Sequence, residues 1–270
     1  PMDWRSQIDE RTTIISEQVK LRDITLRERI LPSVDHFIAP SQFLSEKFLE
    51  WGIPPEQIDH MRTGIDLEMF QGYEAKPATH LRVAFIGTLA PHKGAHLLLE
   101  AWDAIDSETR GEATLRIFGP PAHNPGYVAK LKKQAATCGA ILEGNLAREA
   151  VSSALAEIDL LVVPSIWYEN SPLIILEALA TRTPLIVSDI GGMAELVDPG
   201  RTGFHFEMGS SSALAVTLRD CLDNPGQLDE LYGEDIEVRD VAQDAEAMEE
   251  SYRAEIRKRV ARDSSEQLGS

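Results

Sequence analysis

The sequence contains few cysteines and no long apolar run. Its 270 residues include two cysteines, Cys138 and Cys221, whose spacing matches no metal-binding or redox motif. Isolated thiols of this kind are typical of buried free cysteines in a reducing compartment. No stretch is apolar over the ~18 residues that a membrane-spanning helix needs, and the first residues, PMDWRSQIDERTT, show no signal-peptide pattern. We therefore expect a soluble cytoplasmic protein.

Basic residues are also scarce. Lysine and arginine together number 26 against 44 aspartates and glutamates, which gives a formal net charge of -18. An acidic surface repels nucleic acid and anionic lipid, so neither is expected as a partner, although a local basic pocket could lie within this field. The length suits one large domain or one domain with part of a second, and 43% hydrophobic residues can supply a sizeable core.

The middle of the chain alternates apolar strand-like runs with helical stretches. Near-continuous apolar runs such as DLLVVPS are typical of strands that are buried on both faces of a sheet. Alternating strands and helices favour a parallel sheet with helices on both faces. The sequence therefore predicts an α/β fold with a Rossmann-like parallel sheet. The expected strands cover residues 81–87, 113–119, 139–144, 158–165 and 183–189.

The two ends of the chain show other patterns. The first ~30 residues have apolar side chains near helical spacing and predict an amphipathic helix, with Ile8, Thr12, Ile15, Val19, Leu26 and Ile30 on its apolar face. Ser41 suits a helix cap. The other expected elements are a strand over 34–41, a helix over 43–52, a strand and turn over 56–66, a polar linker over 71–80, a charged helix over 240–260 and a frayed tail over 261–270.

The stretch SIWYENSPLIILEALATRTPLI, residues 165–186, contains a helix start. Ser171 suits the helix cap and Pro172 suits the first helical position. The helix would begin directly after a strand, at the carboxyl edge of the sheet, where ligands of open α/β sheets bind. The free backbone N–H groups and the positive end of the helix dipole at this point suit a phosphate group.

The same stretch holds two glutamates eight positions apart, Glu169 in the loop and Glu177 inside the apolar helix. Glu177 has aliphatic neighbours such as Leu173 and Ile174, so its charge needs a partner. At a rise of ~1.5 Å per residue, Glu177 lies roughly 8 Å along the axis from the helix start. A nucleotide-sugar has a ribose diol, a diphosphate and a sugar that match two carboxylates around a helix start. The spacing alone favours neither this ligand-binding interpretation nor a purely structural one, in which Glu177 is a buried structural residue and Glu169 an exposed loop residue.

Residues 165–186 resemble the Glu-x7-Glu motif of retaining glycosyltransferases of family four, which have the two-domain GT-B fold. Other stretches resemble the family in the same order, among them FIGTLAPHKGAHLLLEAW, LRIFGP and TPLIVSDIGGMAELVDPGRTGFHF. The resemblance covers residues 34–225, and the final helix also fits it. It implies three parts: residues 1–75 as the end of an amino-terminal, acceptor-side domain with the linker, 76–225 as the donor-binding domain, and 226–270 as a carboxy-terminal helix and tail.

The resemblance also implies roles for single residues. Glu169 matches the glutamate that contacts the donor sugar near the reacting carbon, and Glu177 matches the one that binds the ribose hydroxyls. Lys93 matches a lysine that stabilises the charge of the leaving diphosphate, although an exposed lysine at a helix start is the simpler alternative. The implied catalytic residues are Glu169 and Lys93, and the implied donor-binding residues are Gly87, Thr88, Lys93, Leu142, Asn170, Ser171, Pro172, Leu173, Ile174 and Glu177.

Several further positions have two readings. Gly87 ends a strand, where a missing side chain lets the backbone approach a ligand or simply form a turn. Leu142 lies in the strand whose backbone meets the base in the family, and almost any side chain would serve there. The Gly191–Gly192 pair matches a loop that faces the interdomain cleft, and a tight turn explains it equally well. His92 and His123 match no catalytic position.

Two positions depart from the family pattern. Thr88 stands where many members carry an arginine that joins the lysine on the diphosphate, so charge neutralisation is expected to be weaker. Arg182 replaces the glycine that usually ends the motif helix, where a left-handed turn is less comfortable for arginine. Only residues 1–75 precede the donor domain. We therefore expect a fragment, a shortened form or one half of a split enzyme, which binds donor better than it turns over.

The leading hypothesis is the donor-binding part of a retaining hexosyltransferase, which transfers a sugar from a UDP-, GDP- or ADP-linked donor to a glycan, lipid or small-molecule acceptor. The expected step is front-face displacement assisted by Lys93 and the helix start, with no cofactor and no metal, and no Asp-x-Asp motif occurs. A nucleotide-sugar epimerase is an alternative, against which the double-glutamate spacing argues. A non-catalytic nucleotide-sugar-binding module is another, favoured by Thr88. A separate amino-terminal domain and a second copy of the chain are candidate partners.

Overall fold

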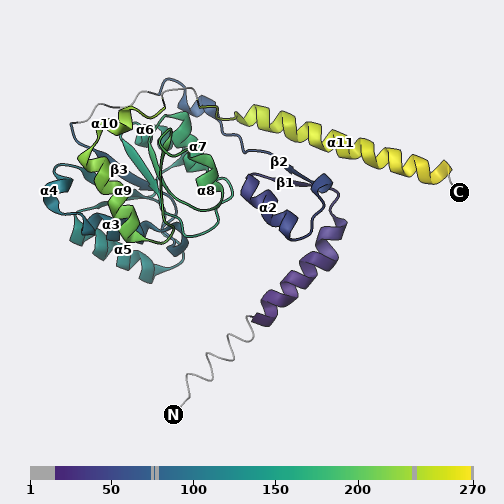
Figure 1. Cartoon of the computed structure of the whole chain (residues 1–270), viewed down its shortest axis with the longest axis horizontal. Helices are drawn as coiled ribbons and strands as arrows, with labels where there is room; N and C mark the ends of the chain where they lie inside the picture. Colours follow the sequence, from purple (N-terminus) through teal and green to yellow (C-terminus); the bar gives the residue numbers. More distant parts are fainter. Residues whose placement is uncertain (1–15, 74–75, 77–78, 233–235, 269–270) are drawn as a thin grey trace, which may run out of the picture.

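A six-stranded parallel sheet forms the centre of the computed structural model, which describes residues 16–73, 76, 79–232 and 236–268. Every pair of neighbouring strands is parallel, and helices lie on both faces of the sheet (Figure 1). The predicted α/β fold with a Rossmann-like parallel sheet is therefore confirmed. In spatial order the strands are β5 (Ile141–Gly144), β4 (Thr114–Phe118), β3 (Arg82–Ile86), β6 (Leu160–Val163), β7 (Leu185–Ser188) and β8 (Gly203–Phe206).

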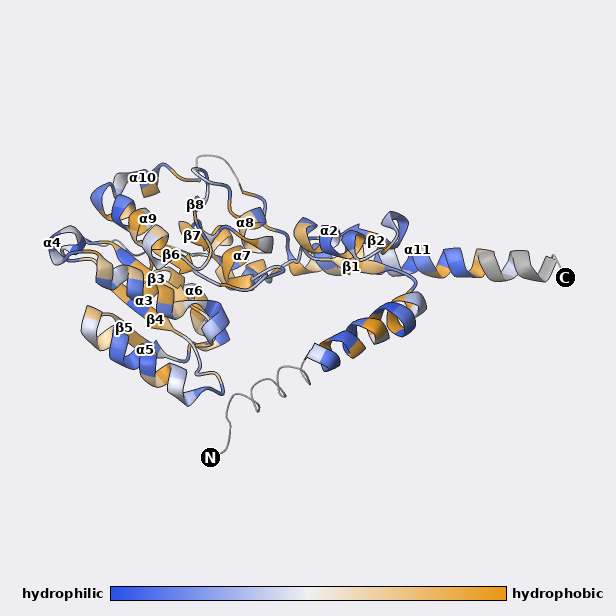
Figure 2. Ribbon diagram, turned by 60° about the horizontal axis from the view of Figure 1, so that its bottom comes forward, coloured by the Kyte–Doolittle hydropathy of each residue, from blue (hydrophilic) through white to orange (hydrophobic). Residues whose placement is uncertain are grey.

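Burial of aliphatic side chains accounts for the sheet. Every residue of β6 and β7 is buried, and all but one of them are leucine, isoleucine or valine. Each such side chain contributes about 1.5–3 kcal/mol when it leaves water. Figure 2 shows hydrophobic residues along the strands and α7, and a mixture of hydrophilic and hydrophobic residues along α5 and α9. The helices of this domain are α3 (Ala95–Ala104), α4 (Ser107–Arg110), α5 (Pro125–Cys138), α6 (Val151–Leu155), α7 (Leu173–Ala180), α8 (Gly191–Leu196), α9 (Ser211–Asp223) and α10 (Gly226–Asp229).

The chain crosses the sheet in two directions from its middle. It moves from β3 to β4 and β5 on one side, and from β6 to β7 and β8 on the other. Right-handed connections then place the helices of the two halves on opposite faces. Accordingly α3 contacts α5, and α7 contacts α8, whereas α9, which follows β8, returns to the face of α3 (Figure 1). The loops that follow the middle strands β3 and β6 therefore meet at the carboxyl edge of the sheet.

The prediction of five strands omitted β8. This strand is only four residues long, and its two middle residues are half-buried, so it lacks a long apolar run. Its first residue, Gly203, lies so close to β7 that an added Cβ atom would stand 2.2 Å from the carbonyl oxygen of Leu185. Pairing with β7 keeps this strand in the sheet, because its own sequence has no strong apolar pattern.

The carboxy-terminal helix is longer than predicted. Helix α11 runs over Val241–Leu268, so the expected frayed tail is wrong as far as Leu268, and residues 269–270 lie outside the described residues. No glycine or proline interrupts this segment, and alanine, glutamate and arginine favour helix throughout. Figure 1 shows α11 extending away from the sheet domain. None of the described helices is both long and apolar enough to cross a membrane.

A two-stranded parallel sheet precedes the linker. Strand β1 (Phe37–Ala39) pairs with β2 (Ile58–His60), and α2 (Gln42–Glu50) connects them. Ser41 caps α2 as predicted, because its hydroxyl accepts the Leu44 N–H at 3.2 Å. The amphipathic helix is described from residue 16 onward, and Ile8, Thr12 and Ile15 lie outside the described residues. The short helical turns are η1 (Leu26–Ile30), η2 (Leu31–Ser33), η3 (Pro55–Gln57), η4 (Leu67–Phe70), η5 (Pro91–Lys93) and η6 (Arg148–Ala150).

Glu195 on α8 joins this amino-terminal part to the sheet domain. Its carboxylate accepts the N–H groups of Gln42 at 2.9 Å and Phe43 at 3.0 Å, so it covers the start of α2. A carboxylate at this point also meets the positive end of the helix dipole. The Phe43 ring stacks on Tyr168 with 4.9 Å between centroids. Helix α2 therefore rests against α8 and against the loop that precedes α7.

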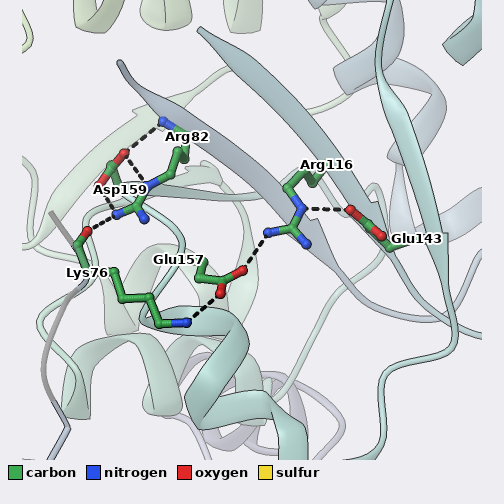
Figure 3. Close-up of polar contacts among 6 residues, drawn as sticks. All are labelled: Lys76, Arg82, Arg116, Glu143, Glu157 and Asp159. Carbon is green, nitrogen blue, oxygen red and sulfur yellow. Dashed lines mark hydrogen bonds and ion pairs between the residues drawn. The ribbon is translucent and has the colours of Figure 1, made fainter. Parts of the chain in front are cut away.

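A network of ion pairs holds the end of the linker against the sheet (Figure 3). Glu157 lies 2.5 Å from Lys76 Nζ and 3.1 Å from Arg116 Nη1, and the hydrogen bond from Lys76 contributes most to lowering the pKa of Glu157. Arg82, the first residue of β3, pairs with Asp159 at 2.7 Å. This network lies toward the amino edge of the sheet, away from the loops that follow β3 and β6. The division into residues 1–75, 76–225 and 226–270 stays a prediction.

Both cysteines are buried and free, as predicted. Burial raises the pKa of the Cys138 thiol and raises that of Cys221 to about 12. Because the thiolate is the reactive form of cysteine, neither side chain is suited to nucleophilic chemistry at neutral pH. The two thiols therefore act as small apolar groups of the core.

Candidate functional site

Two loops at the carboxyl edge of the sheet bring a lysine and a glutamate together. Lys93 ends the turn η5 after β3, and Glu169 lies in the loop after β6. These loops meet because β3 and β6 are neighbours in the sheet. Lys93 Nζ donates to Glu169 Oε1 at 2.6 Å, and the two side chains are 31% and 15% exposed. The structure thus joins the two predicted catalytic residues in one ion pair.

Ser165 supports this pair and was missed by the sequence analysis. Its hydroxyl lies 2.9 Å from Glu169 Oε1 and 2.9 Å from the carbonyl oxygen of His92, and the residue is fully buried. A hydroxyl has one proton, so Ser165 donates to one of these oxygens at a time. The sequence feature that could have identified Ser165 is its position at the end of a buried strand, four positions before Glu169. His92 contributes through its backbone, which also accepts the Ile166 N–H at 2.8 Å.

Gly94 allows the Lys93 loop to approach β6 closely. Its backbone is left-handed, with φ at 75°, and an added Cβ atom would stand 1.8 Å from the carbonyl oxygen of Pro164. Any other residue would have to push the two loops apart. The glycine after Lys93 therefore maintains the short distance between the lysine and Glu169.

Helix α7 begins one residue later than predicted. Its cap is Pro172, which has extended backbone and forms no side-chain cap, so the prediction of Ser171 as the cap is wrong. The backbone turns into the helix only after Pro172, which leaves Ser171 one position too early for its hydroxyl to serve the first turn. The N–H groups of Leu173 and Ile174 have no partner within the helix. They are available to an external acceptor such as a phosphate oxygen.

Glu177 has the partner that its surroundings require. The side chain is 2% exposed within α7, and its Oε1 accepts a hydrogen bond from Arg148 Nη1. Arg148 belongs to η6, which follows β5, and its side chain is 43% exposed. The sequence analysis did not identify this arginine, although it is the first basic residue after a strand end at the same edge of the sheet. Each motif glutamate is thus paired with a cation from a different loop.

The double glycine starts α8 against the loop of Glu169. The Gly192 N–H donates to the carbonyl oxygen of Glu169 at 2.9 Å, and an added Cβ atom at Gly192 would stand 1.9 Å from the carbonyl oxygen of Asn170. Gly191 has a left-handed backbone with φ at 58°. These two residues let α8 lie directly on the motif loop, where Asn170 itself remains exposed.

Three further predicted donor-binding residues lie at the end of β3 or on β5, namely Gly87, Thr88 and Leu142. Gly87 directly follows β3, and its N–H donates to the carbonyl oxygen of Phe118 at 3.0 Å. Thr88 is exposed in the loop that leads to Lys93. Leu142 is half-buried on β5, two strands away from β3. The structure therefore groups Lys93, Glu169 and the start of α7, and leaves Leu142 outside that group.

Known proteins resemble the chain in sequence. It matches the model of the family Glycosyl transferases group 1 over residues 70–237. The glycogen synthase of Mycobacterium tuberculosis is 29% identical over 193 residues, which cover 71% of this chain and 46% of that protein. The D-inositol 3-phosphate glycosyltransferase of Streptomyces scabiei is 27% identical over 216 residues, which cover 73% of this chain and 48% of that protein. The chain spans about half the length of the curated relatives it matches.

A solved structure shares the fold. The crystal structure of Anabaena HepE in complex with UDP and glucose has a TM-score of 0.69 to this chain at 22% identity, covering 81% of this chain and 62% of that one. Likeness at this identity concerns the fold, which is the α/β arrangement of GT-B glycosyltransferases. The family match covers more than half of the chain and contains the Lys93–Glu169 pair and all of α7. The chain belongs to the family Glycosyl transferases group 1.

Proposed function

We propose that this chain is the donor-binding part of a retaining glycosyltransferase of family four, which takes a sugar from a nucleoside-diphosphate sugar. The observation that carries the proposal is the ion pair of Lys93 and Glu169, with 2.6 Å between Nζ and Oε1, beside the uncapped start of α7. A cation and open backbone N–H groups suit a diphosphate, and a carboxylate suits sugar hydroxyls. Glu177, inside the same helix, is proposed to bind the ribose hydroxyls.

The proposed reaction is front-face displacement at the anomeric carbon of the donor sugar. The bond from this carbon to the leaving phosphate oxygen breaks, and an acceptor hydroxyl oxygen bonds to the same face of the carbon. The acceptor proton passes to the departing phosphate oxygen. Lys93 Nζ and the N–H groups of Leu173 and Ile174 stabilise the charge that grows on the diphosphate. Glu169 orients the sugar through its hydroxyls, and Ser165 holds the carboxylate of Glu169 in place.

The comparisons support a nucleotide-sugar donor without defining it. Anabaena HepE was solved with UDP and with UDP-glucose. The relatives include a glycogen synthase and inositol phosphate glycosyltransferases, whose names imply different acceptors. We therefore propose a UDP-, GDP- or ADP-linked donor and a glycan, lipid or small-molecule acceptor. We also propose that this chain binds the donor better than it turns it over. The cytoplasm is the proposed compartment.

A non-catalytic nucleotide-sugar-binding module is the second candidate. Thr88 favours it, because this exposed residue adds no charge to the loop beside Lys93. In this case the site would hold the donor, and no transfer would follow even when an amino-terminal domain is supplied. Measuring hydrolysis of the bound nucleotide-sugar with and without such a domain distinguishes the two candidates: turnover in either mixture supports the transferase.

A calorimetric screen tests the proposed donor site. The chain is titrated with UDP-, GDP- and ADP-glucose, and with glucose 1-phosphate as a ligand that lacks the nucleoside. We expect one base to bind with a Kd between about 1 μM and 1 mM, the range typical of enzyme substrates, and glucose 1-phosphate to bind much more weakly. Failure of all three nucleotide-sugars to bind would overturn the proposed function.

A further inference from the structure

The carboxylate that is proposed to bind the ribose is buried and paired with Arg148. Glu177 is 2% exposed, and Arg148 Nη1 already donates to its Oε1. A ligand hydroxyl cannot reach a carboxylate this deeply buried unless a covering group moves. Of the two partners, Arg148 is the one with room to move, because its side chain is 43% exposed.

The structure around η6 allows the Arg148 side chain to move away from Glu177. The residue starts η6, a turn of three residues that has no side-chain cap. The two residues after it are only half-buried or exposed, and burial resumes at Val151 in α6. The arginine can therefore leave Glu177 without any change in the core. Glu177, in contrast, is held in α7 between buried Leu176 and Ala178 and cannot turn outward.

We propose that Arg148 is a positioning residue. Before a nucleotide binds, it occupies the hydrogen-bonding position at Glu177 Oε1 that the ribose hydroxyls take afterwards. Its guanidinium neutralises Glu177 until a nucleotide arrives, and the ribose hydroxyls then replace it at Oε1. This inference rests on the proposed function of the site. In this arrangement Arg148 stabilises the empty protein and lowers the affinity for nucleotide, because binding has to break the ion pair.

The test compares ligand-induced changes in melting temperature for the wild-type chain and Arg148→Ala, with UDP, GDP and ADP at saturating concentration. The empty variant should melt at a lower temperature, because Glu177 loses its partner. The binding nucleotide should raise the Tm of the variant by roughly 3–6 °C more than that of wild type. Its affinity, measured by calorimetry, should be about tenfold tighter.

Two further variants make the result specific. Arg82→Ala removes another partly buried ion pair, with Asp159, at the amino edge of the sheet, and should lower the Tm without changing the nucleotide-induced shift. Arg148→Gln keeps a hydrogen-bond donor without the charge. It should lie between wild type and Arg148→Ala, and it serves as the test if the alanine variant does not fold.

The possible outcomes distinguish a failure of the Arg148 inference from a failure of the proposed donor-binding function. Equal nucleotide-induced shifts in wild type and Arg148→Ala would show a purely structural arginine and would overturn the inference. Weaker nucleotide binding by Arg148→Ala would also overturn it, because the arginine would then contact the bound nucleotide instead of competing with the ribose for Glu177. If no nucleotide shifts the wild-type Tm, the proposed function falls together with the inference.

Discussion

Replacing Lys93 with alanine is expected to weaken the binding of the nucleoside diphosphate about 100-fold and to leave the affinity for the nucleoside almost unchanged. Hydrogen bonds to a charged group contribute about 1.5–3 kcal/mol, and Lys93 is the cation that pairs with Glu169, four positions before the start of α7. The nucleoside has no phosphate and loses no such contact. Titration calorimetry with both ligands measures the two affinities.

Lys130→Ala is the matched control for Lys93→Ala. Lys130 is also paired with a carboxylate, Glu100, at 3.5 Å, but it lies on α5, away from the loops that follow β3 and β6. Its removal should change neither affinity. Equal losses of diphosphate and nucleoside affinity in Lys93→Ala would contradict a diphosphate role for this lysine. They would indicate that its removal disturbs the whole site through Glu169.

Glu177→Ala is expected to weaken the binding of nucleoside and nucleotide alike by about 100-fold or more. The variant removes the carboxylate that is proposed to accept two ribose hydroxyls, each bond being worth about 1.5–3 kcal/mol. The cost to folding should be small, because Arg148 is 43% exposed and can return to water. Calorimetry gives the affinity, and a melting curve of the empty variant shows whether the fold is kept.

The 2′,3′-dideoxynucleotide provides the control for Glu177→Ala, since it lacks both hydroxyls. Wild type should bind it about as weakly as the variant binds the ordinary nucleotide. The variant should bind the ordinary and dideoxy ligands equally. If Glu177→Ala keeps the affinity of wild type, or still distinguishes the two ligands, the ribose assignment is wrong.

The sequence predicted most of the fold because its central strands are long apolar runs. β3, β4, β6 and β7 each lie within an expected strand, and Ser41 caps the helix that follows it. The short strand β8 was missed, because pairing with β7 rather than its own pattern holds it in the sheet. At the far end, a charged segment without glycine or proline continues as helix into the expected tail, as far as Leu268.

The candidate site was predicted in part. The prediction named Lys93 and Glu169, and the order of β3 and β6 brings them together. Arg148 and Ser165 were missed, because the first is 29 positions from Glu177 and the second is a common residue at a strand end. The first contact joins residues that are distant in sequence, and the second depends on how the loop after β6 folds back on Ser165.

At the two ends of α7, the backbone conformation of single residues could not be predicted from the sequence. Ser171 was expected to cap the helix, but the chain stays extended through Pro172, so the helix starts without a side-chain cap. Arg182, in contrast, adopts the left-handed conformation of the glycine that it replaces, with φ at 53°. Propensity argues against this conformation, and the turn into β7 requires it.

A crystal structure of the chain with the nucleoside diphosphate that binds in the screen shows whether Lys93, Glu177 and the start of α7 hold one donor. We expect ribose hydroxyls within hydrogen-bonding distance of Glu177 and Arg148 turned away from that carboxylate. We also expect the diphosphate against the N–H groups of Leu173 and Ile174 and against Lys93 Nζ. A nucleotide bound elsewhere on the chain, with the ion pairs of Glu169 and Glu177 unchanged, would show that these residues do not form the donor site.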